Sequence, residues 1–425
     1  MSDKLKNDPT LQLMTVEHES PAPKEIKPDA PKLTRVARPL RHIKHIPVKA
    51  LCFHSKQGPI EFTYDNKIKM PVPKNKIVVE VNYFALNPVD QKIKNGYASA
   101  IYGQIGLGRE YSGVITEVGS NASEYWNVGD EVYGIYYHPH LGKGCAASSI
   151  LVDPSTDPIL PRPSSLSPQE AAGALWCMGT AYNIMSYLKK NKYLNENSNV
   201  LINGGTSSVG LFMIQLLKYH LNLKKKLVIV TSGTNSDYLM ENFPDIAEEM
   251  IFINYLTCRG KSSKPLRQMI NEQQIVDYDD SKGEVTIPYT EGKFDVVLDF
   301  VGGYDIIAHS KDLIKTGGAY ITTVGDYVAN YKEDIFNSWD NPSANARKMF
   351  STMLWSFHYH HFYFDPSSKL NTKDSWLVKC GELLESGLIK CLVDKQYDWK
   401  NCKEAFSYMN TQRARGKLVL KTEKF

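Results

Sequence analysis

The pattern of hydrophobic and polar residues divides the chain into three parts. Residues 1–45 show no sustained helical or alternating pattern, which predicts a disordered, proline-rich extension. From residue 46, short apolar runs punctuated by glycines predict the strands of a small barrel-like unit. The predicted strands are "VKALCFH" at 48–54, "KIVVEVNYFAL" at 76–86, "SGVITEVGS" at 112–120 and "VGDEVYGIY" at 128–136.

From residue 168 the pattern changes to alternating helices and strands. A helical stretch at 167–188 precedes the predicted strand, glycine turn and helix of 199–220. Further apolar runs follow at 226–233, 249–255, 294–303 and 317–326. This alternation predicts a doubly wound parallel sheet with right-handed crossovers, so the expected fold class is α/β.

Composition is that of a globular protein. With 425 residues, 42% of them hydrophobic, the chain can bury a large core in about two to three domains. No apolar stretch approaches the roughly 18 residues that cross a bilayer, and the first 30 residues lack the apolar core of a signal peptide. The seven cysteines are scattered and form no C-x-x-C pair. We therefore expect a cytoplasmic protein with reduced thiols and no transmembrane segment.

The positive charge is concentrated at the N-terminus. Residues 1–49 contain ten Lys/Arg and six Asp/Glu, an excess of four that equals the net charge of the whole chain. Five of the basic residues recur at every third position: Lys32, Arg35, Arg38, Arg41 and Lys44. A polyproline II segment has three residues per turn and would align them on one ridge, whereas the neighbouring prolines oppose a continuous helix.

This basic ridge has two interpretations. It favours reversible contact with an anionic membrane surface, at about 1 kcal/mol per basic residue near that surface. Acidic protein and RNA are other candidate partners of the segment, although no nucleic-acid-binding function is expected of the protein. The alternative interpretation is a solvated linker.

Several segments together resemble one protein superfamily. They are "NPVDQKIKNG" (87–96), "GREYSGVITEVG" (108–119), "VGDEVYG" (128–134), "LPRPSSLSPQEAA" (160–172), "GTAY" (179–182), the glycine turn, "FDVVLDFVGG" (294–303) and "RARGKLVL" (413–420). Their order is similar to that of the medium-chain dehydrogenase/reductase superfamily, in its zinc-independent quinone-oxidoreductase branch. The resemblance implies a GroES-like domain at 46–176 completed by 365–425, a Rossmann domain at 177–364, and an active-site cleft between them.

No metal site is expected. Zinc-dependent members of the superfamily bind catalytic zinc through a cysteine and a histidine, where this chain has Asn87 and Arg109, and zinc requires Cys, His or carboxylate ligands. The alternating "HYHH" at 358–361 fits a strand, which the resemblance places last in the Rossmann sheet.

Without zinc, hydride transfer requires a nicotinamide and a hydrogen-bond donor for the developing oxyanion. The candidates that the resemblance offers are the Asn87 amide, the Tyr97 hydroxyl and Thr180, which resembles a nicotinamide-side threonine of the superfamily. Each has a structural alternative, because Asn87 precedes a proline turn, Tyr97 is one of 25 tyrosines, and Thr180 can cap or pack. Asp90 and Glu110 are expected to hold hydrogen bonds of the barrel.

The glycine turn "NGGTSSVG" at 203–210 lacks one expected glycine. If Gly205 and Gly210 are the outer glycines of G-x-G-x-x-G, Ser207 stands where the backbone approaches a pyrophosphate. Its hydroxyl could bond a phosphate, and the helix N-terminus from Ser208 onward still attracts an anion. We expect weakened dinucleotide binding, with complete loss as the alternative.

The ribose end of the cofactor site favours NADP(H). The strand at 226–233 ends in Thr231 and Ser232 without the acidic residue that favours NAD. Asp237, however, would repel a 2′-phosphate, and "TNSDY" supplies no basic residue. The expected cofactor-binding residues are Thr180, Gly205, Thr206, Ser207, Ser208, Val209, Gly210, Ser232 and Gly325.

The basic extension on a zinc-free body gives a narrower resemblance, to fungal peripheral-membrane proteins that assist targeting of the plasma-membrane proton ATPase. This implies a sorting factor on the plasma membrane or the cytosolic face of the secretory pathway. The alternative is a soluble NADPH-dependent reductase of quinones or enones. A homodimer is a further candidate. The helix-like segment 346–357 could make an oligomer or lipid contact, but we expect it to pack against the core.

Overall fold

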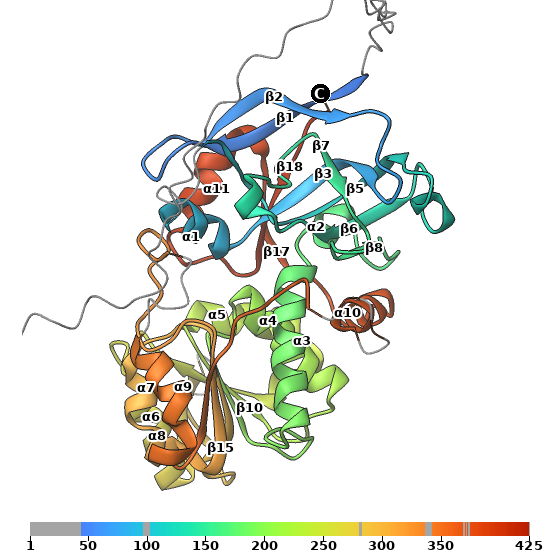
Figure 1. Ribbon diagram of the computed structural model, residues 1–425. Coiled ribbons are helices and arrows are strands. Elements are labelled where there is room, and N and C mark those ends of the chain that lie inside the picture. Colours follow the sequence, from blue (N-terminus) through green and yellow to red (C-terminus); the bar gives the residue numbers. More distant parts are fainter. Residues whose placement is uncertain are drawn as a thin grey trace, which may run out of the picture. The chain divides into compact units, whose positions relative to one another are not determined.

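The computed structural model describes residues 44–96, 103–279, 283–335, 342–368, 370, 372 and 375–424. Within these residues the predicted fold class is confirmed, because a barrel unit of two sheets accompanies a separate parallel sheet flanked by helices (Figure 1). None of the described helices is long and apolar enough to span a membrane.

The barrel unit contains a three-stranded sheet in the order β2-β1-β4 and a seven-stranded sheet in the order β17-β18-β3-β5-β6-β8, with β7 paired to β3. The strands are β1 (His45–Phe53), β2 (Glu61–Lys69), β3 (Ile77–Leu86), β4 (Ile105–Gly106), β5 (Glu110–Val118), β6 (Glu131–Ile135), β7 (Ser149–Val152), β8 (Ile159–Pro161), β17 (Val393–Asp398) and β18 (Lys417–Lys421). Helices α1 (Pro88–Gly96) and α11 (Cys402–Met409) belong to the same unit.

Strand β3 is the centre of the barrel unit. It pairs with β5, β7 and β18, so most of its residues are buried and the apolar run Ile77–Val79 has no solvent-facing position. Its antiparallel partner β18 places Leu418 opposite Leu86. The last strand of the chain thereby joins a sheet formed by the N-terminal half, and carries Lys417 into the barrel interior.

The parallel sheet has six strands in the order β11-β10-β9-β14-β15-β16. Its strands are β9 (Val200–Asn203), β10 (Leu227–Thr231), β11 (Met250–Asn254), β14 (Phe294–Asp299), β15 (Ile314–Thr322) and β16 (His358–His361). Every neighbouring pair is parallel, and the histidine strand β16 lies at one edge as expected. The order reverses between β9 and β14, so the carboxyl ends of these strands form the usual ligand crevice of such sheets.

Helices cover both faces of this sheet, with α3 and α4 on one side and α6 to α9 on the other (Figure 1). The flanking helices are α3 (Leu175–Lys190), α4 (Ser208–Gln215), α5 (Gly233–Asn242), α6 (Ser263–Glu272), α7 (Tyr304–Ala308), α8 (Ser310–Leu313) and α9 (Pro342–Leu354). Helix α10 (Trp376–Glu385) packs against α3, whereas α2 (Pro168–Ala172) packs against β3, β5 and β6 of the barrel unit. Alternation along β9 explains the two cores, because Val200 and Ile202 pack with α3 and α4 whereas Leu201 packs with α6.

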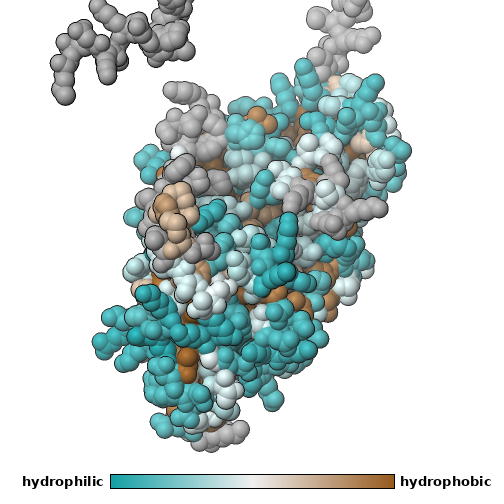
Figure 2. Space-filling model, turned by 60° about the horizontal axis from the view of Figure 1, so that its bottom comes forward, coloured by the Kyte–Doolittle hydropathy of each residue, from teal (hydrophilic) through white to brown (hydrophobic). Residues whose placement is uncertain are grey.

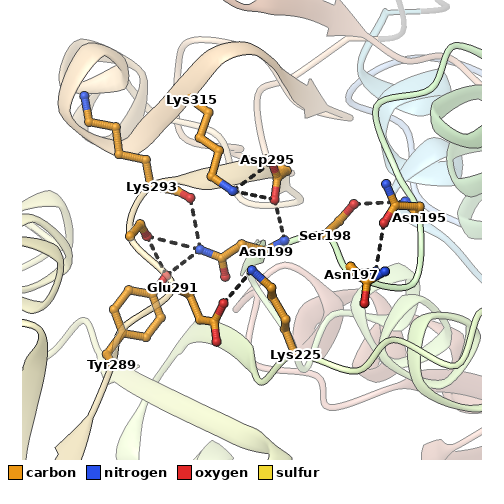
Figure 3. A network of polar contacts seen from close by, with 11 residues as sticks. Asn195, Asn197, Ser198, Asn199, Lys225, Tyr289, Glu291, Lys293, Asp295 and Lys315 are labelled. Atoms are coloured by element: carbon orange, nitrogen blue, oxygen red, sulfur yellow. Dashed lines mark hydrogen bonds and ion pairs between the residues drawn. The ribbon is translucent and has the colours of Figure 1, made fainter.

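A polar network fixes the amino ends of the central strands (Figure 3). Asn199, fully buried before β9, donates its backbone amide to Asp295 and its side-chain amide to Tyr289 and two backbone carbonyls. Lys315 on β15 bonds both oxygens of Asp295 at 2.9 Å. These bonds align the starts of β9, β14 and β15, and therefore the register of their opposite, carboxyl ends.

Two features depart from the sequence-based expectations or extend them. Strands β12 (Gln274–Asp279) and β13 (Gly283–Pro288) form an unanticipated hairpin. The expected helix at 346–357 exists as α9, which ends at Leu354 and packs against β16; Met349 and Met353 on it are 73% and 75% exposed, and Phe357, beyond its end, is buried. The face shown in Figure 2 is mainly hydrophilic, with hydrophobic residues in separate places.

Candidate functional site

The glycine turn after β9 has the geometry of a dinucleotide-binding turn. Gly204 has a φ of 90°, which favours glycine. A β-carbon on Gly205 would lie 2.4 Å from Ile229 Cγ2, and one on Gly210 would lie 2.4 Å from the Gly204 oxygen. Both outer glycines are therefore required by close packing between the turn, β10 and α4.

Ser207, whose hydroxyl could bond a phosphate by the sequence analysis, is the N-cap of α4. Its φ is −63°, so this position does not require glycine. Its hydroxyl donates to the Gly204 oxygen at 2.8 Å and accepts from the Gly210 amide at 3.0 Å. To donate to a phosphate, this hydroxyl would have to give up its hydrogen bond to the Gly204 oxygen. The amides of Ser208 and Val209, in the first turn of α4, have no partner within the helix and suit an anion.

The other predicted cofactor residues meet at the same edge of the sheet. Thr206 accepts a hydrogen bond from Asn235 on α5 at 3.0 Å, and the Ser208 hydroxyl donates to the Gly416 carbonyl at 2.9 Å. Ser232 follows β10 and is buried at the N-cap of α5. Gly325 follows β15 with a φ of 110° and donates its amide to Thr322. The phosphate end of a nicotinamide dinucleotide thus fits the residues present, since the glycines permit the close-packed turn and the first amides of α4 are left for an anion.

The predicted catalytic position is occupied by a closed polar network. We call Asn87, Glu110, Cys177 and Lys417 the buried cluster, because each is at most 4% exposed. Asn87 Nδ2 donates to Glu110 Oε1 at 2.7 Å, and Lys417 Nζ donates to Asn87 Oδ1 and Glu110 Oε1 at 2.6 Å each. Cys177 Sγ lies 3.7 Å from both Asn87 Oδ1 and Lys417 Nζ.

Electrostatics make Lys417 and Glu110 an ion pair. Burial alone would lower the pKa of Lys417, but the charge of Glu110 and its hydrogen bond to Lys417 outweigh burial, so that this pKa lies above its ordinary value. Burial raises the pKa of Cys177, which is therefore a thiol at neutral pH and supplies no negative charge. Glu110 is thus the counter-charge of Lys417, and its second oxygen accepts the Trp176 amide at 3.0 Å.

Arg109, at the second position where zinc-dependent relatives carry a ligand, serves the barrel backbone. Its guanidinium is fully buried and donates to the carbonyls of Lys143 and Gly106 at 2.7 and 2.9 Å. Asp90 Oδ1 lies 3.4 Å from Arg109 Nε, and the Asp90 carboxylate accepts the amides of Asn87 and Gly108. Asp90 and Glu110 therefore hold barrel hydrogen bonds as expected. Among the described residues, no three His, Cys, Asp or Glu side chains are grouped to hold a metal.

Thr180 lies on α3. It is 6% exposed, and its hydroxyl donates to the Trp176 carbonyl one turn earlier at 2.8 Å. Tyr97 lies outside the described residues, as do Lys32, Arg35, Arg38 and Arg41 of the basic ridge. Lys44, the last residue of that ridge, is exposed just before β1.

Aromatic side chains and a loop lie near the buried cluster. Trp176, which neighbours Cys177, makes edge contacts with Tyr137 at 5.3 Å and Phe364 at 5.7 Å. The loop after β15 carries Tyr331, and burial raises the pKa of Tyr331 to about 12, with a smaller contribution from the nearby Cys177. Asn95 on α1 holds this loop by donating to the carbonyls of Tyr331 and Asp334 at 2.9 and 2.8 Å.

The sequence analysis missed the roles of Lys417 and Cys177. Lys417 lies within "RARGKLVL", which was noted only for its resemblance. A usable signal was present, because Lys417 opens an otherwise apolar strand and a buried lysine requires a partner. Nothing in the local sequence identifies that partner.

Comparisons with known proteins agree with this architecture. A family model described as the alcohol dehydrogenase GroES-like domain matches residues 73–155, and one described as a zinc-binding dehydrogenase matches residues 271–420. Quinone oxidoreductase from Coxiella burnetii shares the fold, with a TM-score of 0.60 and 22% identity over 89% of this chain and 100% of that one. The chain belongs to the medium-chain dehydrogenase/reductase superfamily.

Two relatives from Saccharomyces cerevisiae define its place within the superfamily more narrowly. The chain is 67% identical to Protein AST1 over 426 residues, and this alignment covers 100% of this chain and 99% of AST1. It is 63% identical to Protein AST2 over 430 residues, and this alignment covers 100% of both chains. These matches support the relation to the fungal targeting proteins, although the names of the relatives state no activity.

Proposed function

We propose that this protein uses a reductase fold as a scaffold that binds a nucleotide without turning over a substrate. The buried cluster carries this proposal. A reductase needs a hydrogen-bond donor aimed at the oxyanion that forms when hydride reaches the substrate. Asn87 and Thr180, the described candidates for that role, are buried, and each already donates a hydrogen bond to another protein atom.

The buried cluster then serves to hold the protein together. Asn87 precedes α1, Glu110 begins β5, Cys177 lies on α3 and Lys417 begins β18, so one ion pair and its hydrogen bonds join four segments. Truncating one partner of such a buried pair leaves an uncompensated charge, which costs about 3–5 kcal/mol. The pair therefore favours a single, closed arrangement around α3.

The glycine turn supports the nucleotide part of the proposal. The amides of Ser208 and Val209 would hold the pyrophosphate of NADP(H), while Ser232 and Gly325 would lie along the ribose and nicotinamide portions. A reduced nicotinamide supplies a hydride where a substrate can reach it. Here the Asn87 amide and the Thr180 hydroxyl already donate to protein atoms, so binding without turnover is the expected behaviour, and the proposal requires no zinc.

The same scaffold is proposed to work at a membrane. The support is the three-residue spacing of Lys32, Arg35, Arg38, Arg41 and Lys44, together with the relation to the fungal targeting proteins. We propose that this segment holds the protein on anionic cytosolic membrane surfaces, where the body, alone or as a homodimer, assists sorting of a plasma-membrane proton ATPase. The alternative is an active zinc-independent NADPH-dependent reductase of quinones or enones, which the intact glycine packing favours.

Complementation separates the two candidates. Fungal cells that lack this protein and its relatives would receive the full chain, a chain without residues 1–45, or a chain with Arg35, Arg38 and Arg41 changed to Ala. The scaffold proposal expects the full chain alone to restore surface delivery of the proton ATPase. A purified full chain that reduces quinones, together with truncated chains that restore delivery fully, would support the reductase instead.

A further inference from the structure

The adenosine-ribose end of the nucleotide site lacks a local cation. Strand β10 ends at Thr231, and the next residues, Ser232 and Gly233, begin α5 without any basic side chain in its first two turns. The exposed Asp237 even places a negative charge on this helix. By its own sequence, therefore, this end of the sheet favours NADP(H) only through the absence of the acidic residue that binds the ribose of NAD, and supplies no cation for the phosphate of NADP.

The structure brings a cation to this place from the far end of the chain. Arg415 Nη2 lies 3.5 Å from the hydroxyl of Thr234 in the first turn of α5, although 181 residues separate them. The guanidinium carbon lies 5.6 Å from the centre of the Tyr238 ring, a distance at which a cation is attracted to the ring face.

The backbone of Arg415 is held on both sides. Its amide donates to Asp394 Oδ2 at 3.1 Å, and its carbonyl accepts from the Tyr238 hydroxyl at 2.9 Å. The following residue, Gly416, accepts the Ser208 hydroxyl of the glycine turn. One short segment thus contacts both the pyrophosphate end and the ribose end of the site.

We infer that Arg415 recognises the 2′-phosphate of NADP(H) and so makes this site prefer NADP(H) over NAD(H). This inference rests on the proposed nucleotide site. A guanidinium matches a phosphate with paired, charge-assisted hydrogen bonds. The structure describes no ion pair for Arg415 within its described residues, so its charge is not already neutralised at contact distance. The Ser232 hydroxyl caps no helix amide and, with the first amides of α5, lies at the same end of the helix.

Two nearby acids set limits on this preference. Asp394 is within hydrogen-bond distance of the Arg415 backbone, and it also accepts the Tyr408 hydroxyl at 2.9 Å. Asp237 is exposed one turn into α5 and repels a phosphate. We therefore expect moderate NADP(H) affinity with clear selectivity, which Asp237→Asn should improve.

The test uses nucleotide fragments and the full chain. Isothermal titration would measure binding of 2′,5′-ADP, 5′-AMP, NADPH and NADH to the unaltered protein and to Arg415→Ala, Arg415→Lys and Arg413→Ala. Arg413 is an exposed arginine two residues away, and is the matched control. Losing charged hydrogen bonds to the phosphate should weaken 2′,5′-ADP binding by about 10- to 100-fold in Arg415→Ala. Binding of 5′-AMP should be unchanged, Arg415→Lys should recover part of the loss, and Arg413→Ala should behave as the unaltered protein.

Each outcome separates this inference from the proposal beneath it. Equal 2′,5′-ADP affinity in the unaltered protein and Arg415→Ala would overturn the role of Arg415 while leaving the nucleotide site standing. Equal affinity of the unaltered protein for NADPH and NADH would also overturn the role of Arg415 and leave the nucleotide site standing. Binding of none of the four nucleotides would overturn both the role of Arg415 and the proposed nucleotide site. Circular dichroism and melting of each variant would show that a loss of binding does not reflect unfolding.

Discussion

Replacing Lys417 by Met would test whether the buried cluster holds the fold. Lys417 and Glu110 side chains are 2% and 1% exposed, so removing the ammonium leaves the Glu110 carboxylate buried without its counter-charge. It also leaves Asn87 Oδ1 without the donor that lies 2.6 Å away. An uncompensated buried charge of this kind costs about 3–5 kcal/mol. We therefore expect the free energy of unfolding to fall by about that amount.

Urea denaturation followed by circular dichroism would measure the change, with Lys421→Met as the control. Lys421 lies on the same strand but is exposed, and its replacement should change the free energy by no more than about 0.5 kcal/mol. The double variant Lys417→Met with Glu110→Gln should recover most of the loss, because it removes both charges. A loss below about 1 kcal/mol for Lys417→Met, or no recovery in the double variant, would refute the reasoning.

Three further predictions address the tail, the turn and an edge strand. Deleting residues 1–45 should leave a folded body but release the protein from phosphatidylserine-containing liposomes. High salt should release the full chain as well, because five basic residues contribute at most about 5 kcal/mol of attraction, which salt screens. Equal sedimentation of the truncated and full chains with the liposomes would contradict this. Ser207→Gly should improve NADPH affinity severalfold while costing only a few tenths of a kcal/mol of helix stability, whereas unchanged affinity in titration would show that the β-carbon does not hinder the pyrophosphate. Burial lowers the pKa of His361 to about 4, so the folded state holds this ring neutral, and the stability present above the unfolded pKa of about 6.5 is lost as pH falls toward 4. Between pH 7 and 4.5 the melting temperature of His361→Asn should therefore fall by less than that of the unaltered protein. The melting temperature of His140→Asn, a change at an exposed histidine, should fall as much as that of the unaltered protein.

Much of the fold could be predicted because its signals are local. The runs that became β9, β10 and β14 are short and apolar, and glycine or polar turns follow each, so alternation with helices was enough to indicate a parallel sheet. The hairpin of β12 and β13 was missed because many of its residues are polar and the adjacent Ile275 and Val276 break the alternation in β12. The exposure of Met349 and Met353 could not be predicted, because periodicity shows that a helix has an apolar face without showing what covers it.

The candidate site was predictable only where its residues are consecutive. Gly205–Gly210 form one turn, so their spacing was visible in the sequence. Lys417 and Asn87 are 330 residues apart, and Arg415 and Thr234 are 181 apart. Such contacts depend on the pairing of β18 with β3, which no local pattern specifies. The sequence analysis therefore considered the ribose end of the site without knowing that Arg415 lies there. It likewise considered Asn87 without knowing that Lys417 donates to its side-chain oxygen.

The central claim is that the centre of this fold binds a nucleotide but does not transfer hydride. Single-turnover absorbance tests it most directly. Purified full-length protein, in excess over NADPH so that the nucleotide is bound, would be mixed with an excess of a reactive ortho-quinone and followed at the absorbance of reduced nicotinamide. We predict that the absorbance decays no faster than with NADPH and quinone alone. A protein-dependent decay that consumes the bound NADPH would contradict the claim and make the chain an active reductase.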